Sequence, residues 1–166
     1  MPITTDIDRR TLVLTRLFRA PRALVFAAWS DPAHLAQWWG PHQFTLPHCV
    51  QDFRVGGQYR FCMRAPDGSD HWVRGEYTHI DPPARLVFTW LREGDDGDIW
   101  CDTIVSITLE DHGAMTRLTL EQTTFATVAH CEEHAAGWGE CLERLADFVQ
   151  ALPPAIGRTV ATMPVH

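Results

Sequence analysis

The longest helical repeat in this chain of 166 residues lies in the segment Cys131-Glu-Glu-His-Ala-Ala-Gly-Trp-Gly-Glu-Cys-Leu-Glu-Arg-Leu-Ala-Asp-Phe-Val-Gln-Ala-Leu152. Apolar side chains recur there in steps of three and four, at Cys131, Ala135, Trp138, Leu142, Leu145, Val149 and Leu152. This spacing predicts a long amphipathic helix that ends before Pro153-Pro154. Gly137 and Gly139 each cost about 1 kcal/mol of helix stability relative to Ala, so we expect a close approach or a bend there.

The sequence upstream of this helix has the two-residue period of β-strands. Between Phe44 and Phe125, turn residues recur at the spacing that is typical of an antiparallel meander. The six predicted strands are 44–54, 58–65, 72–80, 85–91, 101–110 and 115–124. A seventh strand is predicted over 10–18, and two short helices follow it, the second with Asp31 as N-cap and Pro32 at its first position.

These elements predict an α+β helix-grip fold, in which a curved seven-stranded antiparallel sheet wraps around the long C-terminal helix. A sheet with one apolar face and a helix with one apolar stripe bury both surfaces in this arrangement. A strongly curved sheet cannot touch a straight helix along its whole length, so we expect a pocket with mainly apolar walls between them. A single domain is expected over 10–152, with an N-terminal tail over 1–9 and a C-terminal tail over 153–166.

The composition excludes several classes of function. The net charge of -7 has the wrong sign for binding a phosphate backbone. All 14 basic residues are Arg, which excludes Schiff-base chemistry on Lys. Five Cys occur without a C-x-x-C pair, and we interpret them as reduced thiols of a cytoplasmic protein. No apolar segment approaches the length of a membrane-spanning helix, and no signal peptide pattern is present. We therefore expect neither nucleic acid nor a membrane as a partner.

Nine motifs follow one another along the chain: Ala20-Pro21, Trp29-Ser-Asp-Pro32, Leu35-Ala-Gln-Trp-Trp-Gly-Pro41, Asp52-Phe-Arg-Val-Gly-Gly57, Met63-Arg-Ala-Pro-Asp-Gly68, Gly75-Glu-Tyr77, Pro83-Ala-Arg-Leu-Val-Phe-Thr-Trp90, Thr116-Arg-Leu-Thr-Leu120 and Gly137-Trp138. In order and spacing they resemble the heat-shock-protein-90 ATPase activator-like family of the START-related SRPBCC superfamily. The resemblance covers about residues 10–152 and implies a START-like helix-grip fold with a hydrophobic cavity, in a family whose members mostly lack an established reaction. The eukaryotic co-chaperone that names the family resembles this chain only in its C-terminal domain, so chaperone binding is not carried over.

Large apolar side chains on the predicted strands and helices are the candidates for binding a ligand in the pocket. They are Trp38, Trp39, Phe44, Tyr59, Phe61, Met63, Phe88, Trp90 and Trp138, joined by the polar Glu76 and His134. Neighbouring helix residues point about 100° apart, so we expect Trp38 to face the core and Trp39 the pocket mouth. Trp90 and Trp138 are expected to lie near each other over the cavity.

The segment His130-Cys-Glu-Glu-His134 matches H-x-x-E-H, the pattern of inverted zinc peptidases. No acidic residue remains after Asp147 to provide a distant third ligand, and the predicted fold is too small for such an enzyme. We therefore expect no metal, and no cofactor motif is present. His134 is interpreted as a helix residue at the margin of the apolar stripe, where it either packs or provides a polar group inside the pocket.

Glu76 has two interpretations. Together with Asp52, Arg54 and Arg74, it belongs to a set of alternating charges that could form cross-strand ion pairs on the outer face of the sheet. Alternatively, Glu76 points into the pocket, where burial without a cationic partner would raise its pKa and make it a candidate general acid or base.

Three functions remain open at this level. We favour a binding protein whose cavity takes a small hydrophobic or aromatic molecule. The alternative is an enzyme of cyclase or hydrolase type, as in polyketide cyclases of the wider superfamily, with Glu76 or His134 as the acid–base residue. A weaker alternative is a module that binds a chaperone through an exposed apolar patch. A homodimer could form through the first strand or through a convex face carrying Val87, Trp100 and Ile104.

Overall fold

The computed structural model describes residues 9–152, so the predicted tails, apart from Arg9, lie outside the described residues. The seven strands are β1 (Leu12–Phe18), β2 (Thr45–Gln51), β3 (Gln58–Arg64), β4 (Asp70–Asp81), β5 (Arg85–Glu93), β6 (Ile99–His112) and β7 (Met115–Thr123). The three helices within this part of the chain are α2 (Arg22–Ala27), α3 (Pro32–Trp38) and α4 (Val128–Ala151). The element order agrees with the prediction.

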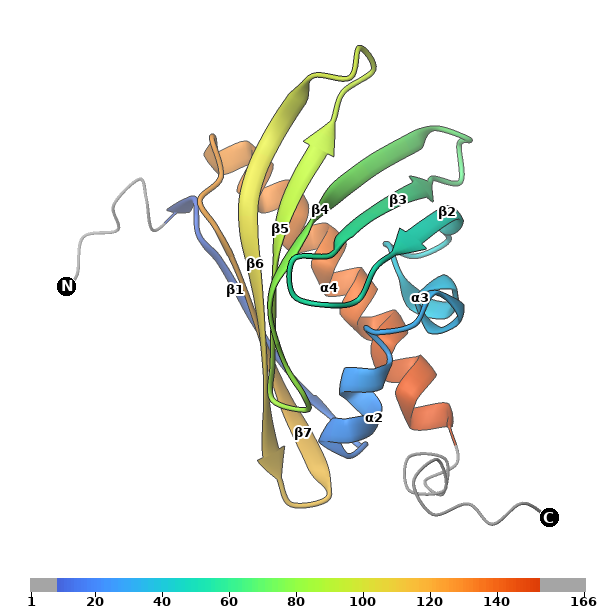
Figure 1. The fold of residues 1–166 in the computed structure, drawn as a ribbon, viewed down its shortest axis with the longest axis vertical. Coiled ribbons are helices and arrows are strands. Elements are labelled where there is room, and N and C mark those ends of the chain that lie inside the picture. The colour runs from blue at the N-terminus through green and yellow to red at the C-terminus, as the bar shows by residue number, and fades with distance from the viewer. Residues whose placement is uncertain (1–8, 153–166) are drawn as a thin grey trace.

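The strands form one antiparallel sheet in the order β1-β7-β6-β5-β4-β3-β2. Strand β1 is joined to the far end of the meander by its pairing with β7, in which Leu14 lies opposite Leu120. Figure 1 shows the sheet curving around α4, which runs diagonally across its concave side, with α2 and α3 beside the C-terminal half of α4. This is the predicted helix-grip arrangement.

Local signals fix the helix ends. The Asp31 carboxylate accepts a hydrogen bond from the backbone N–H of Ala33 at 2.8 Å, and Pro32 is the first residue of α3, as predicted. At the start of α4, the Thr127 hydroxyl accepts from the backbone N–H of His130 at 3.0 Å. The helix therefore begins at Val128, three residues before the start of the apolar repeat.

Several strand ends differ by one to three residues from the predicted ones, and turn geometry and hairpin pairing explain two of them. Strand β2 ends at Gln51 because residues 52–57 form a turn, in which the N–H of Gly57 donates to the carbonyl of Arg54 at 2.8 Å. Strand β6 begins at Ile99 because pairing with β5 continues to Glu93. The apolar pattern shows neither boundary: the predicted strand runs past the end of β2, and the other prediction begins two residues after the start of β6.

The expectation of a close approach at the two helix glycines is wrong. A Cβ atom built on Gly137 would lie 3.7 Å from its nearest neighbour, Cγ of Pro41, and one built on Gly139 would lie 3.9 Å from an Arg16 nitrogen. Both distances are ordinary van der Waals contacts. Neither position requires glycine for space, and at Gly137 the absent side chain leaves room for a cavity.

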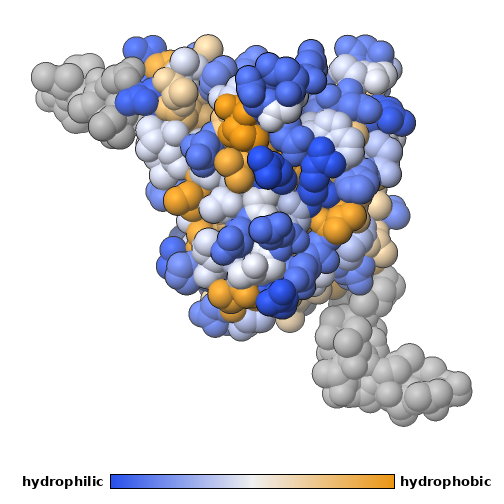
Figure 2. Space-filling model, turned by 45° about the horizontal axis from the view of Figure 1, so that its top comes forward, coloured by the Kyte–Doolittle hydropathy of each residue, from blue (hydrophilic) through white to orange (hydrophobic). Residues whose placement is uncertain are grey.

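The core lies between the concave face of the sheet and the apolar stripe of α4. Its inward strand residues include Leu86, Phe88, Trp90, Val105, Ile107, Leu109, Leu118 and Leu120, and α4 contributes Trp138, Leu142, Leu145 and Val149. On the face seen in Figure 2, apolar side chains are scattered among hydrophilic ones rather than gathered in one patch. Scattered apolar residues are normal on a monomer, so this face does not favour an interaction module. Over residues 9–152, no helix is long and apolar enough to cross a membrane.

Candidate ligand-binding site

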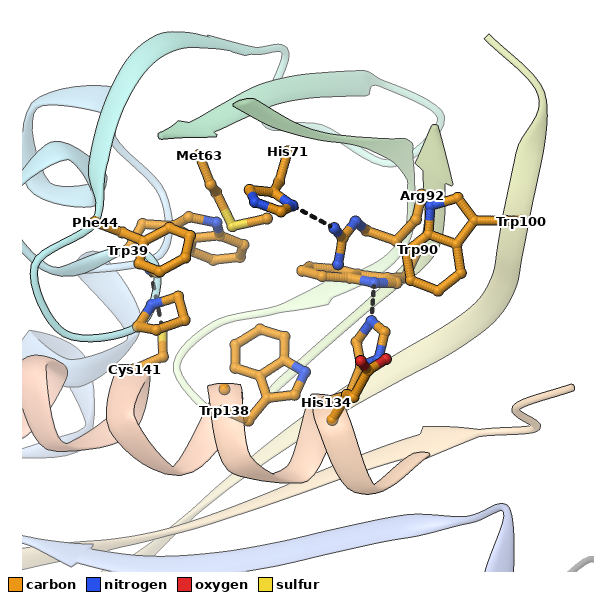
Figure 3. Close-up of a pocket in the computed structure, with 14 residues that line it drawn as sticks. Trp39, Phe44, Met63, His71, Trp90, Arg92, Trp100, His134, Trp138 and Cys141 are labelled. Carbon is orange, nitrogen blue, oxygen red and sulfur yellow. Dashed lines mark hydrogen bonds between the residues drawn. The ribbon is translucent and has the colours of Figure 1, made fainter. Parts of the chain in front are cut away.

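A cavity of about 400 Å³ opens between the first half of α4, the inner faces of β3 to β6 and the turn that follows α3 (Figure 3). Its lining residues are Trp39, Gly40, Pro41, Phe44, Met63, His71, Trp90, Arg92, Trp100, Glu133, His134, Gly137, Trp138 and Cys141. The deep part is apolar, and polar groups lie toward the mouth. Its volume falls within the range of about 300–1,000 Å³ that is usual for small-molecule pockets.

Three indole rings form the deep wall of the cavity. The ring centroids of Trp90 and Trp138 lie 5.2 Å apart, and that of Trp39 lies 5.6 Å from Trp138 and 6.1 Å from Trp90. All three side chains are buried. The predicted proximity of Trp90 and Trp138 is confirmed. The three rings pack on one another and form a continuous aromatic wall, against which a ligand ring can lie.

Neighbouring polar side chains accept hydrogen bonds from two of the three indole N–H groups. Nε1 of Trp138 donates to Oε1 of Gln122 at 2.7 Å, and Nε2 of Gln122 in turn donates to the hydroxyl of Thr103 at 2.8 Å. Nε1 of Trp90 donates to Nε2 of His134 at 3.2 Å. Because these donors are satisfied within the protein, Trp90 and Trp138 present mainly carbon to the cavity.

His134 is held as a neutral imidazole with both nitrogens occupied. Its Nδ1–H donates to the backbone carbonyl of His130 at 2.8 Å, which leaves Nε2 as the acceptor for Trp90. Burial lowers the pKa of His134 from its ordinary 6.5 to about 4, and the positive charge of Arg92 contributes in the same direction. His134 therefore lines the cavity, as one of its two interpretations holds, but it has no free lone pair for a general base.

The mouth of the cavity carries a guanidinium and an imidazole. Arg92 places its guanidinium carbon 4.8 Å from the ring centroid of Trp100, and its Nη2 donates to Nδ1 of His71 at 3.3 Å. Burial lowers the pKa of His71, and the adjacent Arg92 charge adds to this effect. His71 is therefore neutral at pH 7, with Nδ1 as an acceptor.

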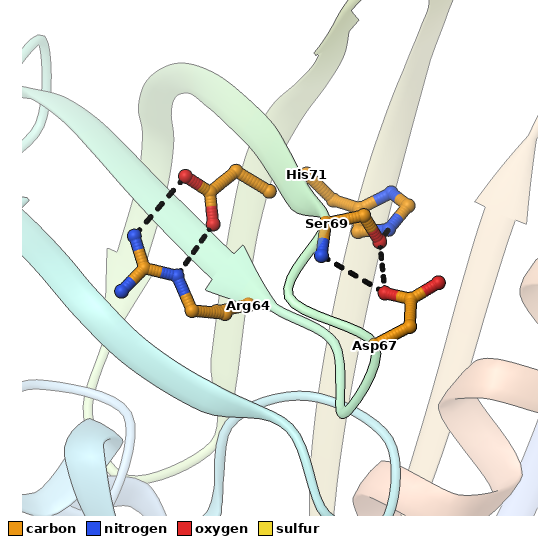
Figure 4. A network of polar contacts seen from close by, with 5 residues as sticks. Arg64, Asp67, Ser69 and His71 are labelled. Atoms are coloured by element: carbon orange, nitrogen blue, oxygen red, sulfur yellow. Dashed lines mark hydrogen bonds and ion pairs between the residues drawn. The ribbon is translucent and has the colours of Figure 1, made fainter.

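A short relay on the β3–β4 hairpin fixes the orientation of His71 (Figure 4). The hydroxyl of Ser69 donates to Oδ1 of Asp67 at 2.6 Å, and Nε2–H of His71 donates to the Ser69 oxygen at 3.1 Å. The order is Asp–Ser–His, so the serine proton is directed at a carboxylate and not at the imidazole. This arrangement orients His71 and does not activate Ser69 as a nucleophile.

Cys141 is also unsuited to nucleophilic chemistry. Burial raises the pKa of its thiol, and its sulfur accepts a hydrogen bond from the N–H of Gly40 at 3.4 Å. The cysteines of the described chain are free thiols. Within residues 9–152, no three His, Cys, Asp or Glu side chains are placed to hold a metal ion, the His130–His134 segment included.

Six of the predicted ligand-binding residues line the main cavity: Trp39, Phe44, Met63, Trp90, His134 and Trp138. Tyr59, Phe61 and Phe88 face the same side of the sheet but line a much smaller cavity of about 10 Å³. Trp39 lines both cavities, so its ring separates them. Trp38 lines neither and is fully buried, with its Nε1 donating to the carbonyl of Ala28 at 3.0 Å. The prediction that Trp38 faces the core is confirmed, but Trp39 lies buried in the deep wall of the cavity and not at its mouth. Trp38, Tyr59, Phe61 and Phe88 are not part of the main cavity wall.

The placement of Glu76 inside the cavity is wrong. Gly75 and Tyr77 point inward on β4, so Glu76 between them is exposed on the outer face. Its neighbours there include Arg74, which forms an ion pair with Glu93 at 3.5 Å. The outer-face interpretation is therefore correct, although Arg74 pairs with Glu93 and not with Glu76.

Arg92, His71 and Trp100 are the principal lining residues that sequence analysis missed. Arg92 has the same strand parity as Phe88 and Trp90, and this signal could have placed it at the cavity. Trp100 was expected on the convex face, which is wrong. The register between β5 and β6 shifts there, with Arg92 opposite Cys101 and Glu93 opposite Ile99, so Trp100 is the extra residue of a bulge. A bulge re-aims a side chain, and Trp100 lines the cavity instead.

Comparisons with known proteins agree with this architecture. The sequence model of the family described as Activator of Hsp90 ATPase homolog 1-like protein matches residues 19–150. A comparison with curated proteins finds no match. Protein CV1439 from Chromobacterium violaceum is 30% identical, with a TM-score of 0.78 over 86% of this chain and 99% of that one. The AHSA1 protein from Silicibacter pomeroyi is 32% identical, with a TM-score of 0.76 over 82% and 95% of the two chains. CalU16 from Micromonospora echinospora is 25% identical, with a TM-score of 0.64 over 89% and 81%.

Proposed function

The chain belongs to the family of Activator of Hsp90 ATPase homolog 1-like proteins, and on this premise we propose that it binds a small hydrophobic or aromatic molecule in the cavity against α4. The observation that carries the proposal is the cavity of about 400 Å³ walled by Trp39, Trp90 and Trp138. Removing apolar surface from water contributes about 25 cal/mol per Å². A planar ring against the indole wall would bury much of its apolar surface.

The contacts within the wall support binding rather than catalysis. Among the predicted acid–base candidates, Glu76 lies outside the cavity and His134 uses both ring nitrogens in hydrogen bonds. The buried thiol of Cys141 is protonated at pH 7, since its pKa is raised. A general acid or base must reach the reacting group within hydrogen-bond distance, and none of these three groups is free to do so. All five cysteines are free thiols, which supports a reducing, cytoplasmic location for the protein.

The test uses a neutral aromatic probe, naphthamide, titrated by calorimetry against the wild type and two helix variants. Gly137→Leu places a side chain in the cavity, whereas Gly139→Leu is matched in chemistry and does not border it. We expect wild type and Gly139→Leu to bind the probe alike, and Gly137→Leu to bind it at least roughly tenfold more weakly, which corresponds to about 1.4 kcal/mol. Absence of binding to the wild type, or equal affinity of the two variants, would contradict the proposal. Native mass spectrometry of protein purified from its source then identifies any retained molecule.

A further inference from the structure

Arg92 is a cation at the mouth of an aromatic cavity without an anionic partner among residues 9–152. Five other arginines of the described chain, namely Arg22, Arg54, Arg60, Arg64 and Arg74, form ion pairs with carboxylates. Arg92 forms one hydrogen bond, with the neutral imidazole of His71, and its Nε–H is buried without an acceptor. The guanidinium therefore has unused donors in a place that is partly removed from water.

This arrangement is costly in the free protein. A buried polar donor without a hydrogen-bond partner lowers stability, and a charged donor lowers it more. Burial lowers the pKa of Arg92, but a guanidinium remains protonated at neutral pH. The ring of Trp100 compensates only in part, because a cation–π contact leaves the N–H donors without an acceptor. The buried Nε–H is out of reach of a ligand, but an anion bound in the cavity would pair with the guanidinium through its Nη hydrogens.

The Arg92 donors are held in place before any ligand arrives. His71 receives one Nη2 hydrogen at Nδ1, and the Ser69 and Asp67 relay fixes that imidazole from the opposite side. Figure 3 shows Arg92 and His71 on the side of the cavity opposite α4, with the indoles of Trp90 and Trp138 between them and the helix. A molecule that reached Arg92 with one end would place its body against the indole wall.

We propose that the ligand class of this cavity is an aromatic carboxylic acid, whose carboxylate binds Arg92 and whose ring lies against the wall formed by Trp39, Trp90 and Trp138. This inference rests on the proposed function and specifies its ligand. A carboxylate matches the planar fork of a single guanidinium, which can donate two parallel hydrogen bonds to it. The flat indole walls favour a ring over a flexible chain.

Two charges define which anion fits. The exposed Glu133 lines the rim and contributes a negative charge near Arg92. With one cation inside and this carboxylate at the rim, the site suits a single negative charge better than the multiple charges of a phosphate group. Because Glu133 is exposed, its repulsion of a bound anion is weakened by solvent and salt.

The test compares naphthoate with naphthamide, which has nearly the same shape and no charge, in wild type, Arg92→Gln and Arg74→Gln. Arg74 is exposed on the outer face, so its variant removes the same charge at a distance from the cavity. We expect the wild type to bind naphthoate roughly 10- to 100-fold more tightly than naphthamide, as a charge-assisted hydrogen bond would give. Arg92→Gln should abolish that preference, and Arg74→Gln should retain it.

Each outcome has a separate meaning. Equal binding of naphthoate and naphthamide by the wild type would overturn the acid-binding inference and leave the apolar cavity function intact. A preference that survives in Arg92→Gln would overturn it as well. If neither probe binds the wild type, both proposals fail. The wild-type comparison requires no variant, so it decides the question even if Arg92→Gln does not fold.

Discussion

We predict that the protein loses stability in mild acid because His134 becomes protonated. Its pKa is about 4 in the folded protein, against the ordinary 6.5 expected after unfolding, mainly because the ring is buried. Between pH 4 and pH 6.5, His134 is protonated in the unfolded chain and neutral in the folded protein. Its contribution to the free energy of unfolding is therefore fully present above pH 6.5 and falls as the pH drops toward 4. A difference of about 2.5 pH units at about 1.4 kcal/mol each corresponds to about 3 kcal/mol.

The contacts of His134 explain why its protonation destabilises the folded protein. A protonated His134 could no longer accept the hydrogen bond from Nε1 of Trp90, so a buried indole donor would lose its partner and a cation would face Arg92 across the cavity. The cost is not offset by a carboxylate at hydrogen-bond distance from His134 within the described residues. Only the exposed Glu133 acts in the opposite direction through its charge.

The assay is urea unfolding of wild type, His134→Gln and His79→Gln from about pH 7 to about pH 4.5. Glutamine offers an amide donor and an acceptor but does not titrate in this range, so His134→Gln should be less stable at pH 7 and lose less stability on acidification. His79 is exposed on β4, and its variant should follow the wild-type profile. Carboxyl groups titrate in all three proteins, so the effect of His134 is read from the difference between their profiles of unfolding free energy against pH. Parallel profiles of wild type and His134→Gln would refute the reasoning.

Three further predictions concern the same helix. Trp138→Ala should destabilise the protein by about 3–5 kcal/mol if its ring is fully packed, and by less, with a larger loss of probe binding, if the cavity relieves the packing; no change in urea midpoint or binding would contradict its placement. Gly137→Ala and Gly139→Ala should each raise the free energy of unfolding by about 1 kcal/mol in the same assay, because neither Cβ meets a clash, and a loss of stability at either position would contradict the open space around it. Elemental analysis should find no stoichiometric zinc, and chelator should leave the melting temperature of wild type and a His130→Ala, His134→Ala double variant unchanged; one zinc per chain would overturn this prediction.

The fold could be predicted because each element carries a local period. Apolar side chains recur every three to four positions over residues 131–152 and at every second position in strands such as β5. The sequence of each element therefore indicates which face is buried. One sheet and one long helix bury both apolar surfaces when the sheet wraps around the helix. The Asp31 and Pro32 signal fixed α3 for the same reason, since a helix cap depends on a few adjacent residues.

The cavity wall could be predicted only in part because it depends on packing between distant elements. Strand parity correctly indicates that Phe61 and Phe88 point inward, yet the ring of Trp39 from the end of α3 separates them from the main cavity. Trp100 reaches the cavity wall because of a bulge, and no repeating apolar pattern in the sequence marks the position of a bulge. Parity alone would have placed Glu76 outside, since it lies between two inward neighbours, and Arg92 inside.

The two sides of the cavity differ in how their hydrogen-bonding groups are satisfied. In the indole wall, the N–H donors of Trp90 and Trp138 are bonded to His134 and Gln122, so the surface that these two rings present is apolar. On the opposite side, Arg92 retains donors that no described residue accepts. Affinity for any aromatic body should therefore depend on the indole wall, and selection among ligands should depend on Arg92. Because Arg92 lies near the end of β5, next to the loop to β6, changes in that hairpin could alter which ligand is chosen without disturbing the core that α4 and the sheet share.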